Sequence, residues 1–456
     1  MTQSTGTQKA GALDPTFADG GVQRLRFSEI SGDAAAAILV LPDKKLMVAI
    51  LLSGIHAPVA MTRLNEDGTL DTEFGGRGTG YVEVALEEAY VEYVFGLSGL
   101  RDGGWLLLGQ YHANDSPDGG LFLVRQHSDG KTDESFGEKG VRLISYLDMG
   151  RPEYVGVRVG VADGDGGTST TKTSRSASHR GASAALQLDG KIVLTARVSH
   201  LEGDPRMKGI VLRLNSDGST DKTFNGTGFA IIELKGLVYD WNSVHGVAVQ
   251  RDGKVLVCGK YVRVAPRFAE GYVMRFDASG RVDTRFNGGT VTVRHSDLID
   301  LSAIWVGETD GRIVAVGNAT GEGVSSGLIV VLTADGFFDF NFNRGQPLFS
   351  RLVPQGLLWE HCWGQEDGSI LVAGSTGEGF VTEDLAMITA RYRSDGALDP
   401  TFNGRGFTVF DEDEGDEGIQ DMKIMADGRI VICGFVWKQA DPLPYIDGGW
   451  VIRYLV

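Results

Sequence analysis

The sequence has no long apolar run. A helix needs about 18 or more consecutive apolar residues to cross a bilayer, and no such stretch occurs among the 456 residues. The first residues, MTQSTGTQKAGALDPTF, also lack the apolar segment of a signal peptide. We therefore expect a cytoplasmic protein without a membrane span, although export through a route that needs no signal peptide would leave no mark in the sequence.

Cysteine and proline are scarce, at 3 and 12 residues. Cys258 and Cys433 lie in apolar runs, VLVCG and IVICG, and with Cys362 they show no metal-ligand spacing. We expect buried thiols in a reducing compartment rather than disulfides or a nucleophile. Glycine is abundant, at 65 residues, and this excess over proline indicates a folded chain with many tight turns.

Positive charge and catalytic motifs are also in short supply. The formal net charge of −17 repels phosphate backbones and anionic lipids, so neither nucleic acid nor a membrane is an expected partner. The sequence lacks H-E-x-x-H, G-x-S-x-G and a phosphate-binding G-x-x-x-x-G-K-[ST]. These absences favour a non-enzymatic function with no metal and no cofactor, but a site gathered from several repeats would leave no local motif.

What the sequence does contain is a repeat. The string RLNEDGTLDTEFGGRG, which begins at residue 63, returns at residue 391 as RYRSDGALDPTFNGRG, and its Asp-x-x-Phe core occurs seven times. A second signature, Asp-Gly or Asp-Lys before an apolar run, alternates with it seven times, as in LPDKKLMVAI and LQLDGKIVLTA. A catalytic motif normally occurs once, so this recurrence indicates a structural unit.

The repeat predicts an all-β fold. Each period of about 60 residues holds about four short strands, which is typical of a propeller blade. The chain starts with the second half of a unit, GALDPTF, and ends with the first half, GGWVIRYLV. We predict a monomeric seven-bladed β-propeller, a single domain over residues 1–456, with four antiparallel strands per blade. Its N-terminal LDPTF segment is expected as outermost strand of the last blade, where Pro15 and Pro400 would be tolerated on an edge.

The charged residues of the repeat are expected to be structural. A three-residue turn closed by Gly68 would place Arg63 opposite Asp71 on the neighbouring strand, where the two form a charge-assisted pair. The same pairing is available to Arg125 with Asp133, Arg213 with Asp221, Arg275 with Asp283, Arg391 with Asp399 and, across the termini, Arg453 with Asp14.

One copy lacks the arginine, because Val331 stands there while Asp339 is kept. A residue dispensable in one copy is a poor catalytic candidate. The repeated phenylalanines are expected to fill the gaps between blades: Phe17, Phe74, Phe136, Phe224, Phe286, Phe342 and Phe402.

The paired signatures DGKIVLTA and RLNSDGSTDKTFNGTG resemble the delta-60 repeat, a bacterial β-propeller repeat family. The resemblance covers the whole chain and implies the fold, but it implies no shared activity and no catalytic residues. Val331, and Asp43 with Lys44 in place of Asp-Gly, depart from the pattern without endangering the ring.

Variable segments are expected to gather on one face. If the short repeated turns join the first strand to the second and the third to the fourth, the other connections share the opposite face, where binding residues concentrate on a rigid scaffold. The longest connection is an inserted loop at 145–181, expected to be disordered, a partner-binding arm or a lid. Its basic residues are Lys172, Arg175, His179 and Arg180, and its Asp163 and Asp165 lack the glutamate of a calcium loop.

A second variable loop carries the acidic run DEDEGDE, from Asp411 to Glu417. Such a run is usually a solvated segment. Asp411, Glu412, Asp413 and Glu414 could also ligate a divalent cation or dock a basic partner.

The mouth of the channel gives a third set of candidates. Near the start of the innermost strands lie non-repeated aromatic, carboxylate and imidazole side chains that could stack a sugar or serve as acid and base, or simply cap the core: Tyr93, Trp241, Asn242, His245, Asp300, Trp359, Glu360 and His361.

Three functions remain open from the sequence. The first is a non-enzymatic binding module that holds a protein partner on its variable-loop face. The second is a carbohydrate-binding or carbohydrate-active propeller with its site at the channel mouth. The third is a structural spacer.

Overall fold

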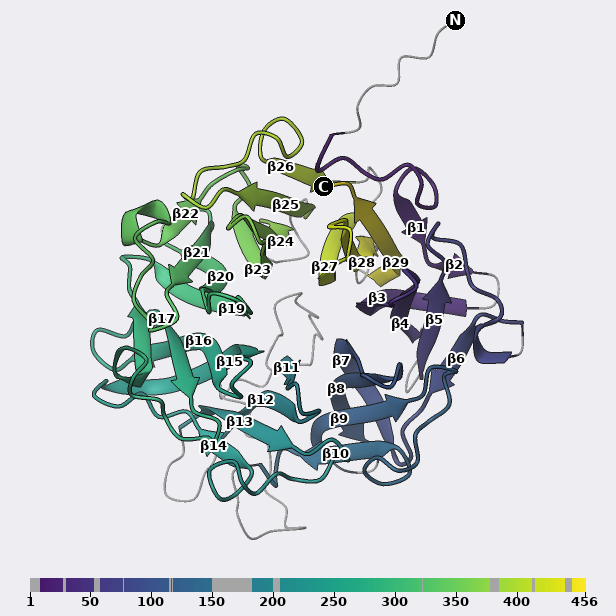
Figure 1. The fold of residues 1–456 in the computed structure, drawn as a ribbon, viewed down its shortest axis with the longest axis horizontal. Coiled ribbons are helices and arrows are strands. Elements are labelled where there is room, and N and C mark those ends of the chain that lie inside the picture. The colour runs from purple at the N-terminus through teal and green to yellow at the C-terminus, as the bar shows by residue number, and fades with distance from the viewer. Residues whose placement is uncertain are drawn as a thin grey trace, which may run out of the picture.

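The computed structural model describes residues 9–27, 30–52, 58–76, 78–114, 116, 118–149, 183–199, 206–321, 323–377, 385–411, 415–438 and 445–456. Its strands form seven antiparallel sheets arranged as blades around a central axis (Figure 1). The prediction of an all-β, seven-bladed propeller with four strands per blade is confirmed. Blade 1 carries one additional short strand, β2, which pairs with its innermost strand.

Within each blade the strands are given from the innermost outward. Blades 1 to 3 comprise β3 (Ile30–Val40), β4 (Leu46–Leu52), β5 (Val59–Leu64) and β6 (Tyr81–Val84), with β2 (Arg26–Phe27); β7 (Ala89–Gly99), β8 (Trp105–Ala113), β9 (Gly119–Gln126) and β10 (Val141–Ser145); and β11 (Ser183–Leu186), β12 (Ile192–Val198), β13 (Lys208–Leu214) and β14 (Phe229–Ile231). Blades 4 and 5 comprise β15 (Tyr239–Val249), β16 (Val255–Arg263), β17 (Ala269–Phe276) and β18 (Thr290–Val293); and β19 (Leu298–Val306), β20 (Ile313–Thr320), β21 (Ser326–Leu332) and β22 (Leu348–Ser350). Blades 6 and 7 comprise β23 (Leu357–Gly364), β24 (Ile370–Thr376), β25 (Met387–Tyr392) and β26 (Phe407–Phe410); and β27 (Asp416–Ile424), β28 (Ile430–Lys438), β29 (Tyr445–Tyr454) and β1 (Val22–Arg24).

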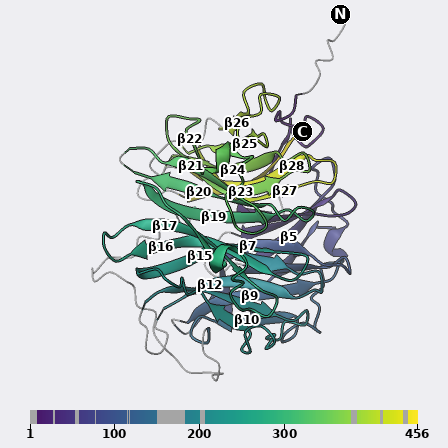
Figure 2. The ribbon, with the colours of Figure 1, turned by 60° about the vertical axis from the view of Figure 1, so that its left-hand side comes forward.

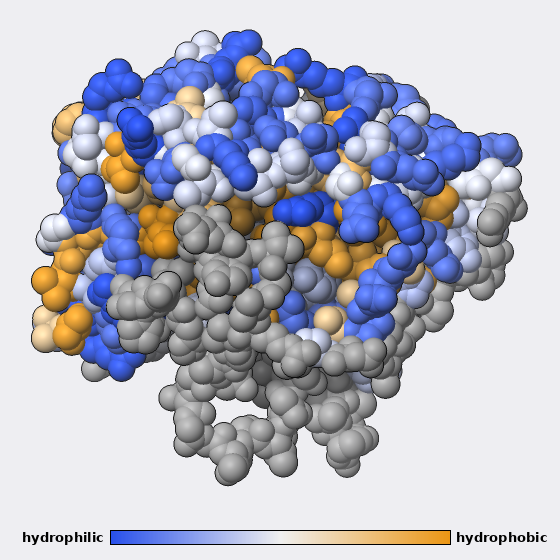
Figure 3. Space-filling view, turned by 90° about the horizontal axis from the view of Figure 1, so that it is seen from below, coloured by the Kyte–Doolittle hydropathy of each residue, from blue (hydrophilic) through white to orange (hydrophobic). Residues whose placement is uncertain are grey.

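Helical structure is slight in the described part of the chain. It consists of the 3-10 turns η1 (Phe74–Gly76), η2 (Asn287–Gly289) and η3 (Asn343–Gly345). None of these could reach across a membrane. The side of the molecule seen in Figure 3 is mostly hydrophilic, with smaller hydrophobic areas between. The apolar core lies between the blades, where clusters of buried side chains join adjacent sheets.

The two ends of the chain meet in blade 7, as predicted. Strand β1 pairs antiparallel with β29, so that Val22 faces Ile452 and Arg24 faces Trp450. The backbone N–H of Asp14 donates to the carbonyl of Arg453 at 2.8 Å. Figure 1 and Figure 2 both show the purple N-terminal segment beside the yellow C-terminal strands. The ring therefore closes by hydrogen bonding, which leaves no unpaired end blade.

The prediction that the LDPTF segment is itself the outermost strand is wrong. In blade 1 the corresponding segment makes one bridge, Leu64 to Leu70, and the outer strand β6 begins only at Tyr81. The aspartate stops the ladder, because the Asp71 carboxylate accepts from the N–H of Glu73 at 3.2 Å and its carbonyl accepts from the N–H of Phe74 at 3.1 Å. Pro15 and Pro400 accordingly lie in turns rather than on an edge ladder.

Each predicted arginine and aspartate of the repeat lies within ion-pair distance. The arginine nitrogen and aspartate oxygen are 2.7 Å apart in Arg63–Asp71, 3.0 Å in Arg125–Asp133, 2.7 Å in Arg213–Asp221, 3.1 Å in Arg275–Asp283, 2.7 Å in Arg391–Asp399 and 2.8 Å in Arg453–Asp14.

In blade 5, where Val331 replaces the arginine, another residue supplies the guanidinium. Arg312, at the start of strand β20, lies 3.1 Å from Asp339 and sits over the ring of Phe342. The carboxylate of blade 5 therefore keeps one of two repeated contacts, because the residues equivalent to Arg312 contact the aspartate in other blades too: Lys45–Asp71, Lys191–Asp221 and Arg429–Asp14.

The repeated phenylalanines lock each blade to the next. Phe224 of blade 3 is fully buried, and a Cβ added to Gly280, in the turn between the third and fourth strands of blade 4, would lie 2.8 Å from its ring. Gly280 has a φ of +82°, so glycine is required there for both space and conformation. The N–H of Asn225 adds a hydrogen bond to the carbonyl of Ser279 at 2.6 Å.

Phe224→Ala is expected to lower the free energy of unfolding by about 3–5 kcal/mol, because it opens a cavity between two blades that cannot collapse onto it. Phe340→Ala is the matched control, since Phe340 is 78% exposed, and we expect it to change stability by less than about 0.5 kcal/mol. Urea unfolding of both variants measures the difference. Equal effects would show that the buried ring does not join the blades.

The three cysteines are free thiols; Cys258 and Cys433 are buried and Cys362 is half-buried. Burial raises the pKa of Cys258 and of Cys362 above the usual range of a thiol. These thiols resist ionisation, which fits a packing role.

Candidate functional site

The propeller has two chemically different faces. The turns from first to second strand and from third to fourth strand lie on the same side of the ring. Arg429, in a turn between first and second strands, lies 3.0 Å from Glu66, in a turn between third and fourth strands. We call this side the repeat face. The remaining connections lie at the other ends of the antiparallel strands, and we call that side the loop face.

A β-bulge interrupts the innermost strand at the same place in six blades. The extra residues are Ala36, Phe95, His245, Ser302, Glu360 and Gln420. In blades 2, 4, 5, 6 and 7 the second strand has a glycine facing this bulge. A larger residue would not fit, because its Cβ would collide with the carbonyl two residues before the bulge residue. Those carbonyls belong to Tyr93, Ser243, Asp300, Leu358 and Gly418. Bulges re-aim side chains, and they are common beside active sites.

The bulge of blade 4 brings four polar side chains together against blade 5. His245 Nε2 lies 2.9 Å from Ser243 Oγ, and its Nδ1 lies 2.9 Å from Asp300 Oδ1 and 3.0 Å from the carbonyl of Leu301. Lys260 Nζ lies 2.5 Å from Asp300 Oδ2. We call Ser243, His245, Lys260 and Asp300 the channel-wall cluster.

The charges in this cluster are fixed by their neighbours. Burial opposes ionisation of Asp300, but His245 and Lys260 together hold the pKa of this carboxyl well below its usual range. The carbonyl of Leu301 accepts from Nδ1 of His245, and Asp300 Oδ1 lies within ion-pair distance of the same nitrogen, so this nitrogen carries the hydrogen. In the neutral imidazole, Nε2 is then free to accept the hydroxyl proton of Ser243.

The sequence pointed to part of this cluster. His245 and Asp300 were both expected at the channel, and the structure brings them together from adjacent blades. Ser243 and Lys260 were not expected. Their signal lies in cross-strand register, because Ser243 and Lys260 are direct partners on β15 and β16, and that pairing depends on the bulge.

Trp359 does not lie at an open mouth. It is fully buried between blades 5 and 6, where it meets Tyr392 edge-on at 6.5 Å. Its ring cannot stack on a sugar, because no face of it reaches solvent. Asn242 is also buried; it accepts from the N–H of Gly209 at 2.8 Å and donates to the carbonyl of Ile232 at 3.1 Å. Both side chains hold neighbouring blades together.

The other expected mouth residues are spread around the channel. Tyr93 of blade 2 donates its hydroxyl to Gln420 of blade 7 at 2.8 Å, past the small alanines of β3 in blade 1. Trp241 and His361 are half-buried, and Glu360 is a nearly buried bulge residue. The structure therefore does not gather the predicted set into one site. In the described part of the chain, no three His, Cys, Asp or Glu side chains are grouped as metal ligands would be.

The charged loops can be placed only in part. Asp411 is exposed directly after β26. The expectation of a solvated acidic run is wrong at its other end, because Asp416 and Glu417 are buried in β27. Lys172, Arg175 and Arg180, with most of the loop at 145–181, and Glu412, Asp413 and Glu414 lie outside the described residues.

The loop face of blades 3 to 5 carries exposed apolar and cationic side chains. Side-chain contacts tie these loops together: Arg206 of blade 3 sits over the ring of Tyr239 of blade 4, and Arg267 lies 3.4 Å from Asp240 within blade 4. We call the exposed members of this region the loop-face arc: Arg206, Val238, Val264, Arg267, Arg294, Leu298 and Val324.

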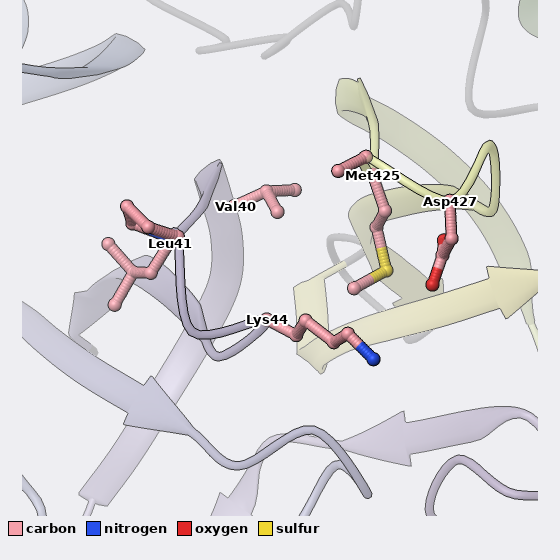
Figure 4. A pocket seen from close by; sticks show the side chains of 7 residues that line it. Val40, Leu41, Lys44, Met425 and Asp427 are labelled. Carbon is pink, nitrogen blue, oxygen red and sulfur yellow. The ribbon is translucent and has the colours of Figure 1, made fainter.

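A small cavity of about 240 Å³ lies at the seam between blades 7 and 1. Figure 4 shows Lys44, Leu41 and Val40 on one hairpin and Met425 and Asp427 on the other. Both hairpins are repeated turns, so this cavity is the space left between two neighbouring blades.

Comparison with known proteins bears on the fold. The family model described as "Domain of unknown function (DUF5122) beta-propeller" matches residues 187–224, 250–286, 308–342 and 365–402, which lie in blades 3 to 6. The chain is a β-propeller repeat protein. The more specific delta-60 assignment stays a prediction from the sequence signatures. No curated protein matches this propeller by sequence.

Solved structures similar to this propeller have very different sequences. A polysaccharide lyase of family PL25, an ulvan lyase, is 11% identical, with a TM-score of 0.47, over 98% of this chain and 95% of that one. A glucose dehydrogenase is 11% identical, with a TM-score of 0.39, over 95% and 99%. The β-propeller domain of the Trilobed protease from Pyrococcus furiosus is 9% identical, with a TM-score of 0.41, over 93% and 94%. These proteins differ in activity, and likenesses this distant carry no argument about the activity of this propeller.

Proposed function

We propose that this propeller is a binding module that recognises a protein partner through the loop-face arc on blades 3 to 5. The observation that supports it most is the exposure of four apolar side chains among arginines. Val238, Val264, Leu298 and Val324 are all exposed. Exposed apolar residues that gather on one surface are typical of an interaction site.

The arginines define the partner's chemistry. The side chains of Arg267 and Arg294 are 72% and 56% exposed, although the chain as a whole has a formal net charge of −17. Arginine combines a guanidinium fork with apolar contact area, and it is enriched at protein interfaces. The partner that fits is a protein surface with acidic side chains around apolar ones.

The repeat face offers a second candidate surface for binding a protein partner. Phe337 and Phe340 of blade 5 are both strongly exposed. The corresponding positions in the six other repeats hold alanine, polar or charged residues and proline, for example Thr69 and Thr72 in blade 1 and Ala397 and Pro400 in blade 6. An experiment on the loop-face arc must therefore include this surface.

Photo-crosslinking in cells distinguishes the two surfaces. A photoreactive amino acid in place of Val264 is expected to give one discrete cross-linked partner, and the same amino acid in place of Phe337 is expected to give none. A discrete product at position 337 with nothing at position 264 would move the binding surface to the repeat face and contradict the proposal.

Charge reversal tests the chemistry of the same surface. Arg267→Glu with Arg294→Glu is expected to weaken binding of the cross-linked partner by at least about tenfold, because acidic groups would then face acidic groups. Lys131→Glu is the matched control, since Lys131 lies in a repeated turn with its side chain 81% exposed. Titration of purified proteins at two salt concentrations measures both variants, and an equal loss in the control would rule out a local basic site.

A further inference from the structure

The channel-wall cluster has the connectivity of a nucleophilic hydrolase. Ser243 Oγ lies 2.9 Å from His245 Nε2, and His245 Nδ1 lies 2.9 Å from Asp300 Oδ1. A hydroxyl, an imidazole base and a carboxylate beside the base are the three groups that acyl transfer uses, and they are recognised by geometry rather than by sequence order. Here the hydrogen on Nδ1 goes to the carbonyl of Leu301, and Asp300 places its charge beside the ring.

The ring itself does not require these residues. The positions equivalent to Ser243 and Asp300 hold Tyr93 in blade 2, Leu358 in blade 6 and Gly418 in blade 7. Positions equivalent to His245 hold Ala36, Phe95, Ser302, Glu360 and Gln420. The same bulged strand therefore forms with apolar, small or polar side chains, and only the junction of blades 4 and 5 combines serine, histidine and aspartate among the described residues.

Neighbouring groups hold the base in one orientation. The carbonyl of Leu301 accepts from Nδ1 of His245 at 3.0 Å, and Lys260 fixes the second oxygen of Asp300 at 2.5 Å. Tyr272 donates its buried hydroxyl to the carbonyl of Ser243 at 3.0 Å, which holds the backbone beside the nucleophile. Such support limits the rotation of each reacting side chain.

We propose that Ser243, His245 and Asp300 form an ester-hydrolysing site in the channel wall, separate from the loop-face arc. Ser243 Oγ attacks the ester carbonyl carbon, and its proton passes to His245 Nε2. The bond from carbon to the alcohol oxygen then breaks, and the alcohol leaves with that proton. Water attacks the acyl-serine and gives a proton to Nε2; the bond to Oγ breaks, Oγ regains the proton, and the carboxylic acid is released.

Exposure defines the size of substrate. Ser243 is 1% exposed, the His245 side chain is 13% exposed, and the side chains of Asp300 and Lys260 are each 28% exposed. Asp300 and Lys260 are thus the more exposed members of the cluster. Because Ser243 is buried, the substrate class we assign is esters with a short acyl group. Ser243 and His245 are the catalytic residues, and Asp300 is a positioning residue.

Covalent labelling of the intact wild-type chain is the decisive test. Incubation with methanesulfonyl fluoride, whose sulfonyl group is as small as a short acyl group, is expected to add one methanesulfonyl group to Ser243 with loss of fluoride, located by peptide mass spectrometry. Absence of an adduct on Ser243, or labelling of other residues alone, would overturn the proposal. This result depends on no variant, so a folding defect cannot imitate it.

Variants then test the assignment of roles with 4-nitrophenyl acetate as substrate. Ser243→Ala and His245→Gln are expected to reduce hydrolysis to the uncatalysed rate. Asp300→Asn is expected to lower kcat by about 10⁴-fold while its adduct, formed more slowly, stays on Ser243. Ser302→Ala, at the bulge of the neighbouring blade, is the control that keeps full activity. Undiminished hydrolysis by Ser243→Ala would contradict the proposal even if the loop-face arc binds its partner.

Discussion

Asp14→Ala is expected to lower the free energy of unfolding by about 3–5 kcal/mol, because it leaves the guanidinium of Arg453 buried without its carboxylate. The side chains of Asp14 and Arg453 are 2% and 1% exposed, and their ion pair spans the two ends of the chain. Arg429 lies 3.2 Å from the same carboxylate. Loss of Asp14 thus weakens blade 7, which is built from both ends of the chain.

The pH dependence identifies the cause of this loss. Burial opposes ionisation of Asp14, but hydrogen bonds from Thr16 and the charges of Arg453 and Arg429 hold its pKa below the usual value. A carboxyl with a lowered pKa stabilises the fold above its ordinary pKa, and this contribution is lost as the pH falls through the folded-state pKa. Urea unfolding should therefore show the wild type and Asp14→Ala converging in acid.

Asp19→Ala is the matched control for closure, since Asp19 is exposed in the same N-terminal segment. We expect a change in stability below about 0.5 kcal/mol. If both variants lost the same stability, the buried pair would not be what holds the ends of the chain together.

Glu417→Gln is expected to stabilise the propeller above pH 8. Glu417 is fully buried at the start of β27, and burial, followed by the nearby charge of Asp411, raises the pKa of this carboxyl to about 8 from 4.5, although Arg24 opposes the shift. The folded state then holds a proton that the unfolded state has released. Stability from this group is full below pH 4.5 and is lost as the pH rises through about 8.

The glutamine variant does not titrate, so it removes this loss. Relative to Glu417→Gln, the wild type should lose about 5 kcal/mol of stability between acid and alkaline pH, at roughly 1.4 kcal/mol for each unit of pKa shift. Urea unfolding at pH 4.5, 6.5 and 8.5 measures the difference. The exposed Glu134→Gln serves as the control, and parallel pH curves for the wild type and Glu417→Gln would refute the assignment.

The sequence was sufficient for the ring because each repeated residue serves a local need that recurs in every blade. Each blade needs an aspartate that ends a strand, a glycine at positive φ and a phenylalanine beneath the next turn. These residues therefore recur in the sequence at the same spacing. Arg453 and Asp14 could be paired from the sequence by treating the two ends of the chain as one more copy.

The second partner of the repeated aspartate was missed, although the repeat reports it. Arg312 stands directly after Asp-Gly, where Lys191 and Arg429 also contact the aspartates of their blades. The LDPTF segment was misplaced for another reason, because backbone hydrogen bonds to Asp71 turn the chain before a ladder can form.

The candidate sites were predicted least well. Trp359 was assigned to the channel because it lies on an innermost strand, but side chains of such a strand also pack between blades, where Trp359 is buried. His245 and Asp300 were recognised as non-repeated polar residues, yet their contact depends on a bulge and on the junction of two blades. Aligning adjacent repeats would have shown that Ser243 and Asp300 occupy the same position on the innermost strands of blades 4 and 5.

Amide hydrogen exchange tests ring closure most directly. The N–H of Asp14 donates to Arg453, and the N–H of Arg453 donates to Gly21, just as the N–H groups of Asp221 and Arg213 donate within the continuous blade 3. We expect the amides of Asp14 and Arg453 to exchange as slowly as those of Asp221 and Arg213. Fast exchange at Asp14 and Arg453, with Asp221 and Arg213 still protected, would show that the two ends of the chain do not share a blade.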